Sequence, residues 1–147
     1  MQALFVIIII SGMLTIALKY ASITTKQTSD TYMRESAELF MNSAVELSLL
    51  SIQGYDRKSH NNCLKEIHLI SKDERFTADI NITKYYLYNG VDNDGKWYTK
   101  CKDRNVSIQT KESQGMVMLE VEVDTNTTNP RNRGQDIRLI RRTLQRP

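Results

Sequence analysis

The chain has little of what enzymes need. Its 147 residues include only two histidines and two cysteines. It contains no Gly-X-Ser-X-Gly nucleophile motif, no phosphate-binding P-loop and no paired-histidine metal motif. We therefore expect no catalytic residues, no resident metal and no cofactor, and we predict that the protein is not an enzyme.

Proline is scarce as well, and charge is missing from the start of the chain. The two prolines are Pro130 and Pro147, so no proline interrupts the earlier sequence. Residues 2–18 form one uncharged apolar run that Lys19 closes. A transmembrane helix needs about 20 apolar residues, with a lower limit near 17. A cleaved secretory signal usually begins with basic residues, which are missing here. The run predicts a membrane anchor, with a cleaved signal or a buried core helix as alternatives.

The sequence stays compatible with a helix after the apolar run. Residues 22–31 are polar and rich in hydroxyl groups, with weak helix propensity. Beyond them, apolar residues recur at spacings of three and four, which is typical of one helix face: Met33, Ala37, Phe40, Met41, Ala44, Leu47 and Leu50. Gln53-Gly54 is a stop signal. We predict one helix of about 52 residues, roughly 78 Å long, with a transmembrane half at 1–19 and an amphipathic half at 20–54.

The remaining residues, 55–147, are predicted to form one β-rich head with a basic C-terminal tail. Alternating apolar residues at 76–83 and 117–123 indicate half-buried strands. Segments 85–88 and 96–99 flank Asn-Gly and Asp-Gly pairs typical of hairpin turns, and 106–108 indicates a further short strand. Residues 137–144 fit a last strand or a short helix equally well. The expected fold class is α+β, with the long N-terminal helix packed on a four- or five-stranded antiparallel sheet.

The first 50 residues resemble the N-terminal helix of type IV pilins and type II secretion pseudopilins. In that family a glutamate precedes a run of Leu, Val and Ile, followed by a Gly and small residues; here Gln2 takes the glutamate position and Gly12 follows the run. An amide cannot form the family's ion pair with a neighbouring subunit's amino terminus. The family's basic leader and processing glycine do not precede Met1. We expect a start codon assigned too far downstream, the alternative being an unprocessed member.

The resemblance implies a structural subunit of a secretion or pilus-related assembly. The protein would be anchored in the bacterial inner membrane with its head in the periplasm, and its partners would be like subunits and the assembly machinery. Gln2 would be the polar group near the helix start, Leu4, Phe5 and Ile8 would belong to the bundle surface, and Gly12 would be a point of close approach. The rival interpretation is a membrane-anchored periplasmic adaptor that does not polymerise.

The two cysteines, Cys63 and Cys101, are predicted to form a disulfide. The head of an exported protein lies in an oxidising compartment, where such bonds persist. Free thiols in a cytoplasmic protein are the alternative. A zinc site with His60 and His68 is a weaker one, because the spacings match no common zinc pattern.

Three Asn-X-Ser/Thr triplets begin at Asn81, Asn105 and Asn126, each with an Asp two residues upstream. This resembles the extended acceptor sequence of bacterial N-linked glycosylation, in which an acidic residue at that position is required. Modification would need the head to lie outside the cytoplasm. The alternative is that Asp, Asn and Thr simply crowd turns and exposed strand faces.

Two further patterns are weaker. Asp92 and Asp94, followed by Gly95, offer alternate oxygen ligands as a calcium loop does, although a plain Asp-Gly turn is favoured. In the basic tail, Arg138, Arg141 and Arg142 could contact phosphates as a basic patch in a pilin-like DNA-uptake subunit. The net charge of only +3 implies no polyanion partner by itself, and no aromatic residue is interleaved to stack on bases. A strand or tail with solvated cations is favoured.

Overall fold

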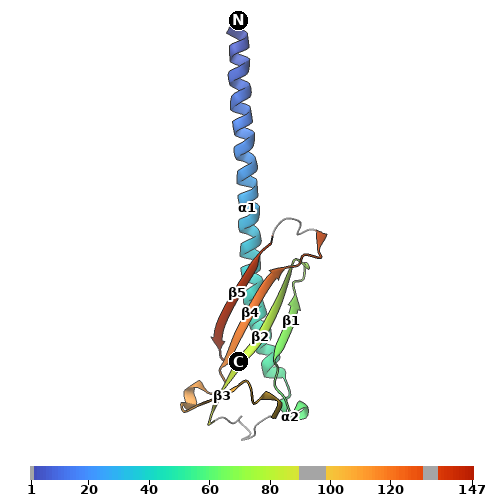
Figure 1. Ribbon diagram of the computed structural model, residues 1–147, viewed down its shortest axis with the longest axis vertical. Helices are drawn as coiled ribbons and strands as arrows, with labels where there is room; N and C mark the ends of the chain where they lie inside the picture. The colour runs from blue at the N-terminus through green and yellow to red at the C-terminus, as the bar shows by residue number, and fades with distance from the viewer. Residues whose placement is uncertain (1, 90–98, 131–135) are drawn as a thin grey trace. The chain divides into compact units, whose positions relative to one another are not determined.

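The computed structural model of the chain describes residues 2–89, 99–130 and 136–147. Their internal packing divides the chain into two compact units, residues 1–36 and 37–147. One uninterrupted helix, α1 (Gln2–Gly54), contributes to both units (Figure 1). The predicted continuous helix is therefore confirmed, and it ends at the glycine that the sequence indicated.

The hydroxyl-rich part of α1 satisfies its own polar side chains. The hydroxyls of Thr24, Thr25, Thr28 and Thr31 each donate to the carbonyl four residues earlier, at 2.9–3.0 Å. Hydroxyls that bond within the helix do not offer the backbone a competing partner outside it. A stretch with weak helix propensity therefore continues the helix with these four hydroxyls satisfied within it.

The second unit contains a five-stranded sheet. Its strands are β1 (Glu66–Ile70), β2 (Phe76–Tyr88), β3 (Asn105–Ile108), β4 (Val117–Thr125) and β5 (Arg138–Gln145). The order across the sheet is β1-β2-β4-β5, all antiparallel, and β3 pairs with β2 in parallel. A short helix α2 (Arg57–His60) and the 3-10 turns η1 (Thr99–Cys101) and η2 (Lys111–Ser113) connect these elements.

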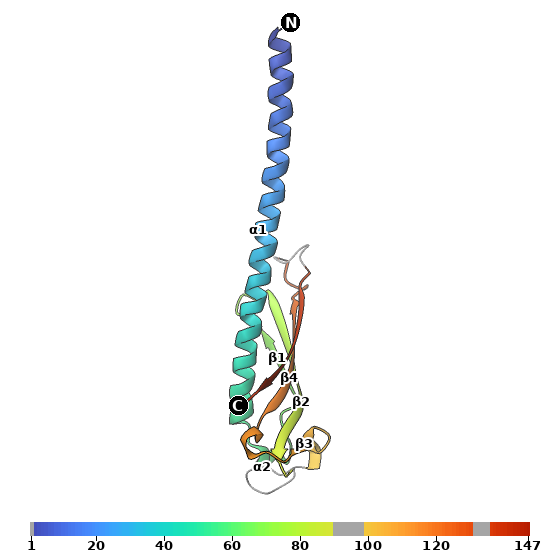
Figure 2. The same cartoon turned by 90° about the vertical axis from the view of Figure 1, so that its left-hand side faces the viewer.

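The core of the second unit lies between residues 37–54 of α1 and one face of the sheet (Figure 2). Alternate residues of β2 and β4 are buried on this inner face, among them Ile80, Ile82, Leu119 and Val121. The Phe40 ring of α1 stacks on that of Phe76, with centroids 6.3 Å apart. The predicted α+β class, a long helix packed on an antiparallel sheet, is confirmed.

The buried face of α1 differs from the predicted one at its C-terminal end. Leu47 and Leu50 are exposed, whereas Ser48 and Ile52 are buried. Buried positions 37, 41, 44, 48 and 52 follow a spacing close to the 3.6-residue helical period. The Ser48 hydroxyl donates to the Val45 carbonyl at 2.7 Å, so burying this polar side chain leaves its donor satisfied.

The strand predictions need three corrections. Residues 76–88 form one strand with a register shift between Ile82 and Lys84, where two strands were expected. The edge strand β1 was not predicted, and β3 pairs in parallel although an antiparallel meander was expected. Alternation of side chains reports which face is buried and says nothing about partners or direction. Residues 138–145 are a strand, which decides between the two predicted alternatives.

Candidate functional site

The apolar segment of α1, residues 5–18, has no partner among the described residues of this chain. Every large apolar side chain in it is exposed, from Phe5 at 67% through Ile8 to Leu18. The helix is long and apolar enough to cross a membrane by length and composition. Monomeric soluble proteins rarely expose contiguous apolar surface of this extent, so the segment is a candidate surface for lipid or for other chains.

Three of the predicted assembly residues share one side of this segment. Phe5, Ile8 and Gly12 follow a spacing of three and four, which places them on one helix face. A β-carbon at Gly12 would meet no atom within 4 Å, so nothing in the described chain requires glycine there. The Thr15 hydroxyl donates to the Gly12 carbonyl at 2.8 Å. The side chains of Gln2 and Leu4 lie outside the described residues.

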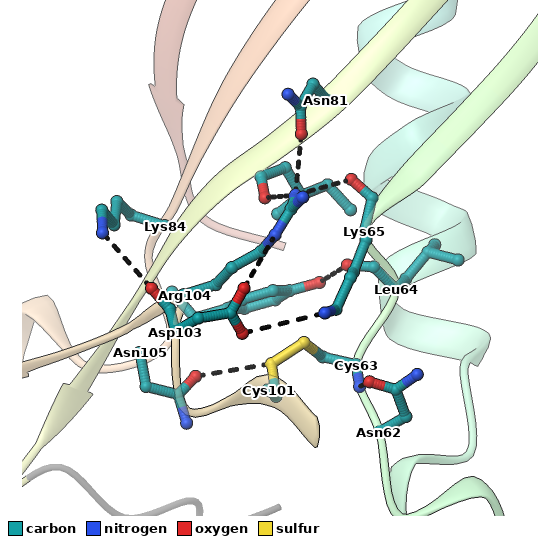
Figure 3. A network of polar contacts seen from close by, with 12 residues as sticks. Asn62, Cys63, Leu64, Lys65, Asn81, Lys84, Cys101, Asp103, Arg104 and Asn105 are labelled. Carbon is teal, nitrogen blue, oxygen red and sulfur yellow. Dashed lines mark hydrogen bonds and ion pairs between the residues drawn. A yellow bond between two sulfur atoms is a disulfide. The ribbon is translucent and has the colours of Figure 1, made fainter. Parts of the chain in front are cut away.

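The predicted disulfide between Cys63 and Cys101 is confirmed. Both residues are buried, and their Cα atoms are 5.6 Å apart. The bond joins the segment entering β1 to the turn entering β3 (Figure 3). These two strands lie one after the other on the same edge of β2: β1 pairs with residues 77–81 and β3 with residues 85–88.

Arg104 fills the gap between these two strands, and we call its surroundings the edge junction (residues 63–65, 81–85 and 101–105). The guanidinium donates to the Lys65 carbonyl at 3.1 Å, to the Asn81 side-chain oxygen at 2.7 Å and to the Ile82 carbonyl. Its own backbone carbonyl accepts from the Tyr85 amide at 2.8 Å. A single side chain thereby donates to β2 and to the residue that precedes β1, at the point where β1 and β3 both begin (Figure 3).

Tyr85 supports the edge junction from the inner face of the sheet. Its ring is 3% exposed, its hydroxyl donates to the Leu64 carbonyl at 2.6 Å, and the Arg57 guanidinium carbon lies 5.6 Å from the ring centroid. Burial raises the pKa of Tyr85 to about 12, against smaller opposing effects of Arg57 and Arg104. The phenol therefore remains a hydrogen-bond donor across the physiological range.

The three arginines of the predicted basic patch do not share one face. Arg138 pairs with Glu122 and lies 3.8 Å from Asp124, and Arg142 donates to Glu120 at 3.1 Å, all on the outer face. Arg141 points to the inner face and donates to the Asn42 side chain of α1 at 2.7 Å. Strand alternation separates neighbouring arginines, and cross-strand carboxylates neutralise two of them.

The outer face of the sheet is a mixed-charge surface. His68 Nδ1 and Asp79 pair across β1 and β2, a carboxylate partner that sequence spacing did not indicate. Glu122 lies in the middle of this surface. Burial raises its pKa most, Arg138 lowers it, and the Asp124 and Asp79 carboxylates raise it further, so the net direction is upward. Such cross-strand pairs set strand register more than they form a ligand site.

The three predicted glycan acceptors have different surroundings. Asn81 lies within the central strand β2, Asn105 begins β3, and Asn126 follows the last residue of β4. The calcium candidates Asp92 and Asp94 lie outside the described residues. Among the residues that the structure describes, no three His, Cys, Asp or Glu side chains gather in a metal-binding group, and the disulfide removes both cysteines from the zinc alternative.

Sequence reasoning missed Arg104 and β1. The only available signal was that Arg104 directly precedes a short strand and lies three residues after Cys101. Such a position becomes informative only when β1 and β3 are known to share one edge of β2.

The comparisons with known proteins give no relative. No protein-family model, no curated protein and no solved structure matches the chain.

Proposed function

We propose that the protein is a structural subunit, pilin-like or pseudopilin-like, of a secretion or pilus-related assembly in a bacterial inner membrane. The apolar segment would be its anchor in the membrane and its contact to like subunits in a helical bundle. One observation carries the proposal. The same uninterrupted helix exposes apolar side chains throughout residues 5–18 and buries one face, from Ala37 to Ile52, against the sheet.

The chemistry of the apolar segment suits two environments. Lipid tails are as apolar as leucine, so helix association in membranes depends on close packing rather than on hydrophobic transfer. The segment can therefore exchange lipid for the interior of a helical bundle at modest net free energy. The exposed Gly12 supports close approach of a neighbouring helix, because no side chain covers its backbone.

The disulfide supports a head outside the cytoplasm. Disulfides persist in oxidising compartments such as the bacterial periplasm and are rare in the cytosol. Cys63 and Cys101 are paired at ordinary Cα separation and neither is exposed. A periplasmic head is the orientation that a pilin-like subunit needs.

Cysteine cross-linking in native membranes tests polymerisation. Both natural cysteines are in the disulfide, so introduced ones react alone. Ile8→Cys and Ile10→Cys lie on nearly opposite sides of α1, since two residues turn a helix by about 200°. The double variant is expected to give an oxidation-dependent ladder of multimers, whereas each single variant stops at dimers. A membrane-bound double variant that gives no species beyond a dimer would contradict the proposal and favour a non-polymerising adaptor.

The N-terminus gives an independent test. Intact mass and N-terminal sequencing of protein purified from its native membrane should show a trimmed, N-methylated residue if it is processed as a pilin. An unmodified chain beginning at Met1 would favour the adaptor.

A further inference from the structure

Three copies of the same acceptor pattern occupy three different structural environments. Each has an Asp two residues before the Asn and a hydroxyl residue two residues after it. A transferring enzyme must take several residues of extended backbone into its own site, so folded proteins are modified on surface loops. The fold therefore decides which of the three copies is available.

Asn81 is fixed by backbone pairing to a strand on each side and by a hydrogen bond to its side chain. Its backbone pairs with Glu66 in β1 and with Glu120 in β4. Its side-chain oxygen accepts from Arg104 at 2.7 Å, and the hydroxyl of Thr83 donates to the Met118 carbonyl at 3.1 Å. Presenting this triplet would require breaking the middle of the sheet.

Asn105 is held by its strand and by the disulfide. It pairs with Tyr85 at the start of β3, and the following residues up to Ile108 continue the pairing. Cys101, four residues earlier, is bonded to Cys63. Presenting this triplet would require β3 to leave β2 within a covalently closed segment.

Asn126 begins a surface turn just beyond the last β2–β4 pair, and its backbone amide donates to the Arg75 carbonyl at 2.7 Å. The amide of Asn129 donates to the Asn126 carbonyl at 3.2 Å, which closes the turn. The side-chain oxygen of Asn126 accepts from the backbone amide of Thr128 at 3.2 Å and from its hydroxyl at 2.5 Å. The side-chain nitrogen donates to the Glu74 carbonyl at 2.9 Å. Its triplet can therefore be presented by breaking the hydrogen bonds of the turn and those to Glu74 and Arg75, while the β2–β4 pairs from Phe76 and Thr125 onward stay intact.

Space for a sugar lies beside this turn. An open polar pocket of about 400 Å³ is lined by residues of the turn and of the β1–β2 connection, namely Lys72, Asp73, Glu74, Asn126, Thr128, Asn129 and Pro130. A first sugar ring on the Asn126 nitrogen would have hydrogen-bond donors and acceptors within this pocket.

We propose that Asn126 is the N-glycosylation site of the folded protein and that Asn81 and Asn105 are not modified. The donor class is an oligosaccharide linked to a polyisoprenyl diphosphate. The Asn126 side-chain nitrogen attacks the anomeric carbon and loses one proton; the bond from that carbon to the diphosphate oxygen breaks, and the lipid diphosphate leaves. The inference rests on the extracytoplasmic head of the proposed function. It does not depend on polymerisation.

Glycopeptide mass spectrometry of the full chain from its native membranes tests the inference. We expect one glycan per chain, on the peptide containing Asn126, and none on those containing Asn81 or Asn105. Asn126→Gln and Thr128→Val should remove it completely, Thr128→Ser should keep it, and Asn81→Gln and Asn105→Gln should leave it unchanged. An unmodified Asn126 or comparable occupancy at Asn81 would overturn the inference.

Acceptor peptides separate the effect of the fold from that of sequence. Three synthetic peptides centred on the three asparagines are incubated with native membranes and the lipid-linked donor, beside the unglycosylated full chain. All three peptides should be modified, but only Asn126 in the folded chain. Equal modification of all sites in the folded chain, or no modification of the Asn126 peptide, would refute the proposal. A cross-linking ladder from unglycosylated chains would show that the proposed function stands without it.

Discussion

One helix contains two stretches that differ in burial: one packs a face against the sheet, and the other is exposed on every side. Residues 37–52 bury one face against the sheet and leave the other in solvent, as in an ordinary amphipathic helix. Residues 5–18 are apolar on every side and buried on none. Packing within the chain therefore stabilises the first stretch, whereas no described residue of the chain covers the second. The same secondary structure thus packs within the head in one place and, as proposed above, would serve assembly in the other.

The sharpest test of this comparison uses the same substitution in both stretches. Met41 is 2% exposed and Met13 is 68% exposed. Met41→Ala should lower the free energy of unfolding of the head by about 2–5 kcal/mol, because it leaves a cavity in the core. Met13→Ala should change it by less than about 0.5 kcal/mol. Hydrogen exchange at β2 and β4 amides of the full chain in detergent micelles measures both; similar losses of protection would remove the distinction.

A charge placed in each stretch tests which of the two stretches holds the protein in a membrane. Ile9→Lys puts a cation in the apolar segment, and transfer of lysine to the centre of a membrane helix costs about 2.5–3.5 kcal/mol. Its carbonate-resistant membrane fraction should fall severalfold. Leu39 is exposed in the part of α1 that packs on the sheet, so Leu39→Lys should leave that membrane fraction unchanged. Full membrane retention of Ile9→Lys would show that the segment is not the anchor.

The edge junction offers a comparison within the head. Arg104→Ala removes the donor of the Asn81 side-chain oxygen, whereas the Lys65 carbonyl keeps the Ile82 amide, and it should cost about 1–3 kcal/mol. Arg141→Ala removes one hydrogen bond between exposed groups and should cost about 1 kcal/mol or less. Urea unfolding of the full chain in micelles, followed by hydrogen exchange in β1 and β3, distinguishes them. Equal losses of unfolding free energy in the two variants would mean that Arg104 does not stabilise the edge junction more than an exposed hydrogen bond does.

The smallest expected effect concerns pH. The pKa of Tyr85 is about 12 in the folded chain and 10.0 without the fold. Above pH 10 the unfolded state loses this proton first, so folding stability should fall as pH rises, by about 1 kcal/mol at pH 11. Tyr85→Phe should remove this part of the alkaline loss. Unfolding midpoints at pH 8 and pH 11 give the difference, and an unchanged pH dependence in the variant would contradict the assignment.

Sequence patterns predicted the features that depend on local periodicity or on covalent chemistry. The continuous helix, the alternating strand at 117–123 and the disulfide were all correctly predicted. Pairing and direction were not, because Val106 and Ile108 alternate in the same way in a parallel or an antiparallel pair. The sequence left a basic patch in β5 open as the weaker alternative, since only the register brings Glu120 and Glu122 beside Arg142 and Arg138. The role of Arg104 likewise depends on two segments distant in sequence.

The disulfide has a mechanical consequence. Once the noncovalent contacts of the head have given way, a pulling force between α1 and the C-terminus passes along the backbone to Cys63 and through the sulfur bridge to Cys101. Residues 64–100, which include β1 and β2, cannot lengthen under that load while the bridge is intact. Roughly 120–130 Å of potential extension is thereby withheld, at about 3.3–3.6 Å per residue. In the extended chain, the central strand β2 therefore stays out of the line of tension.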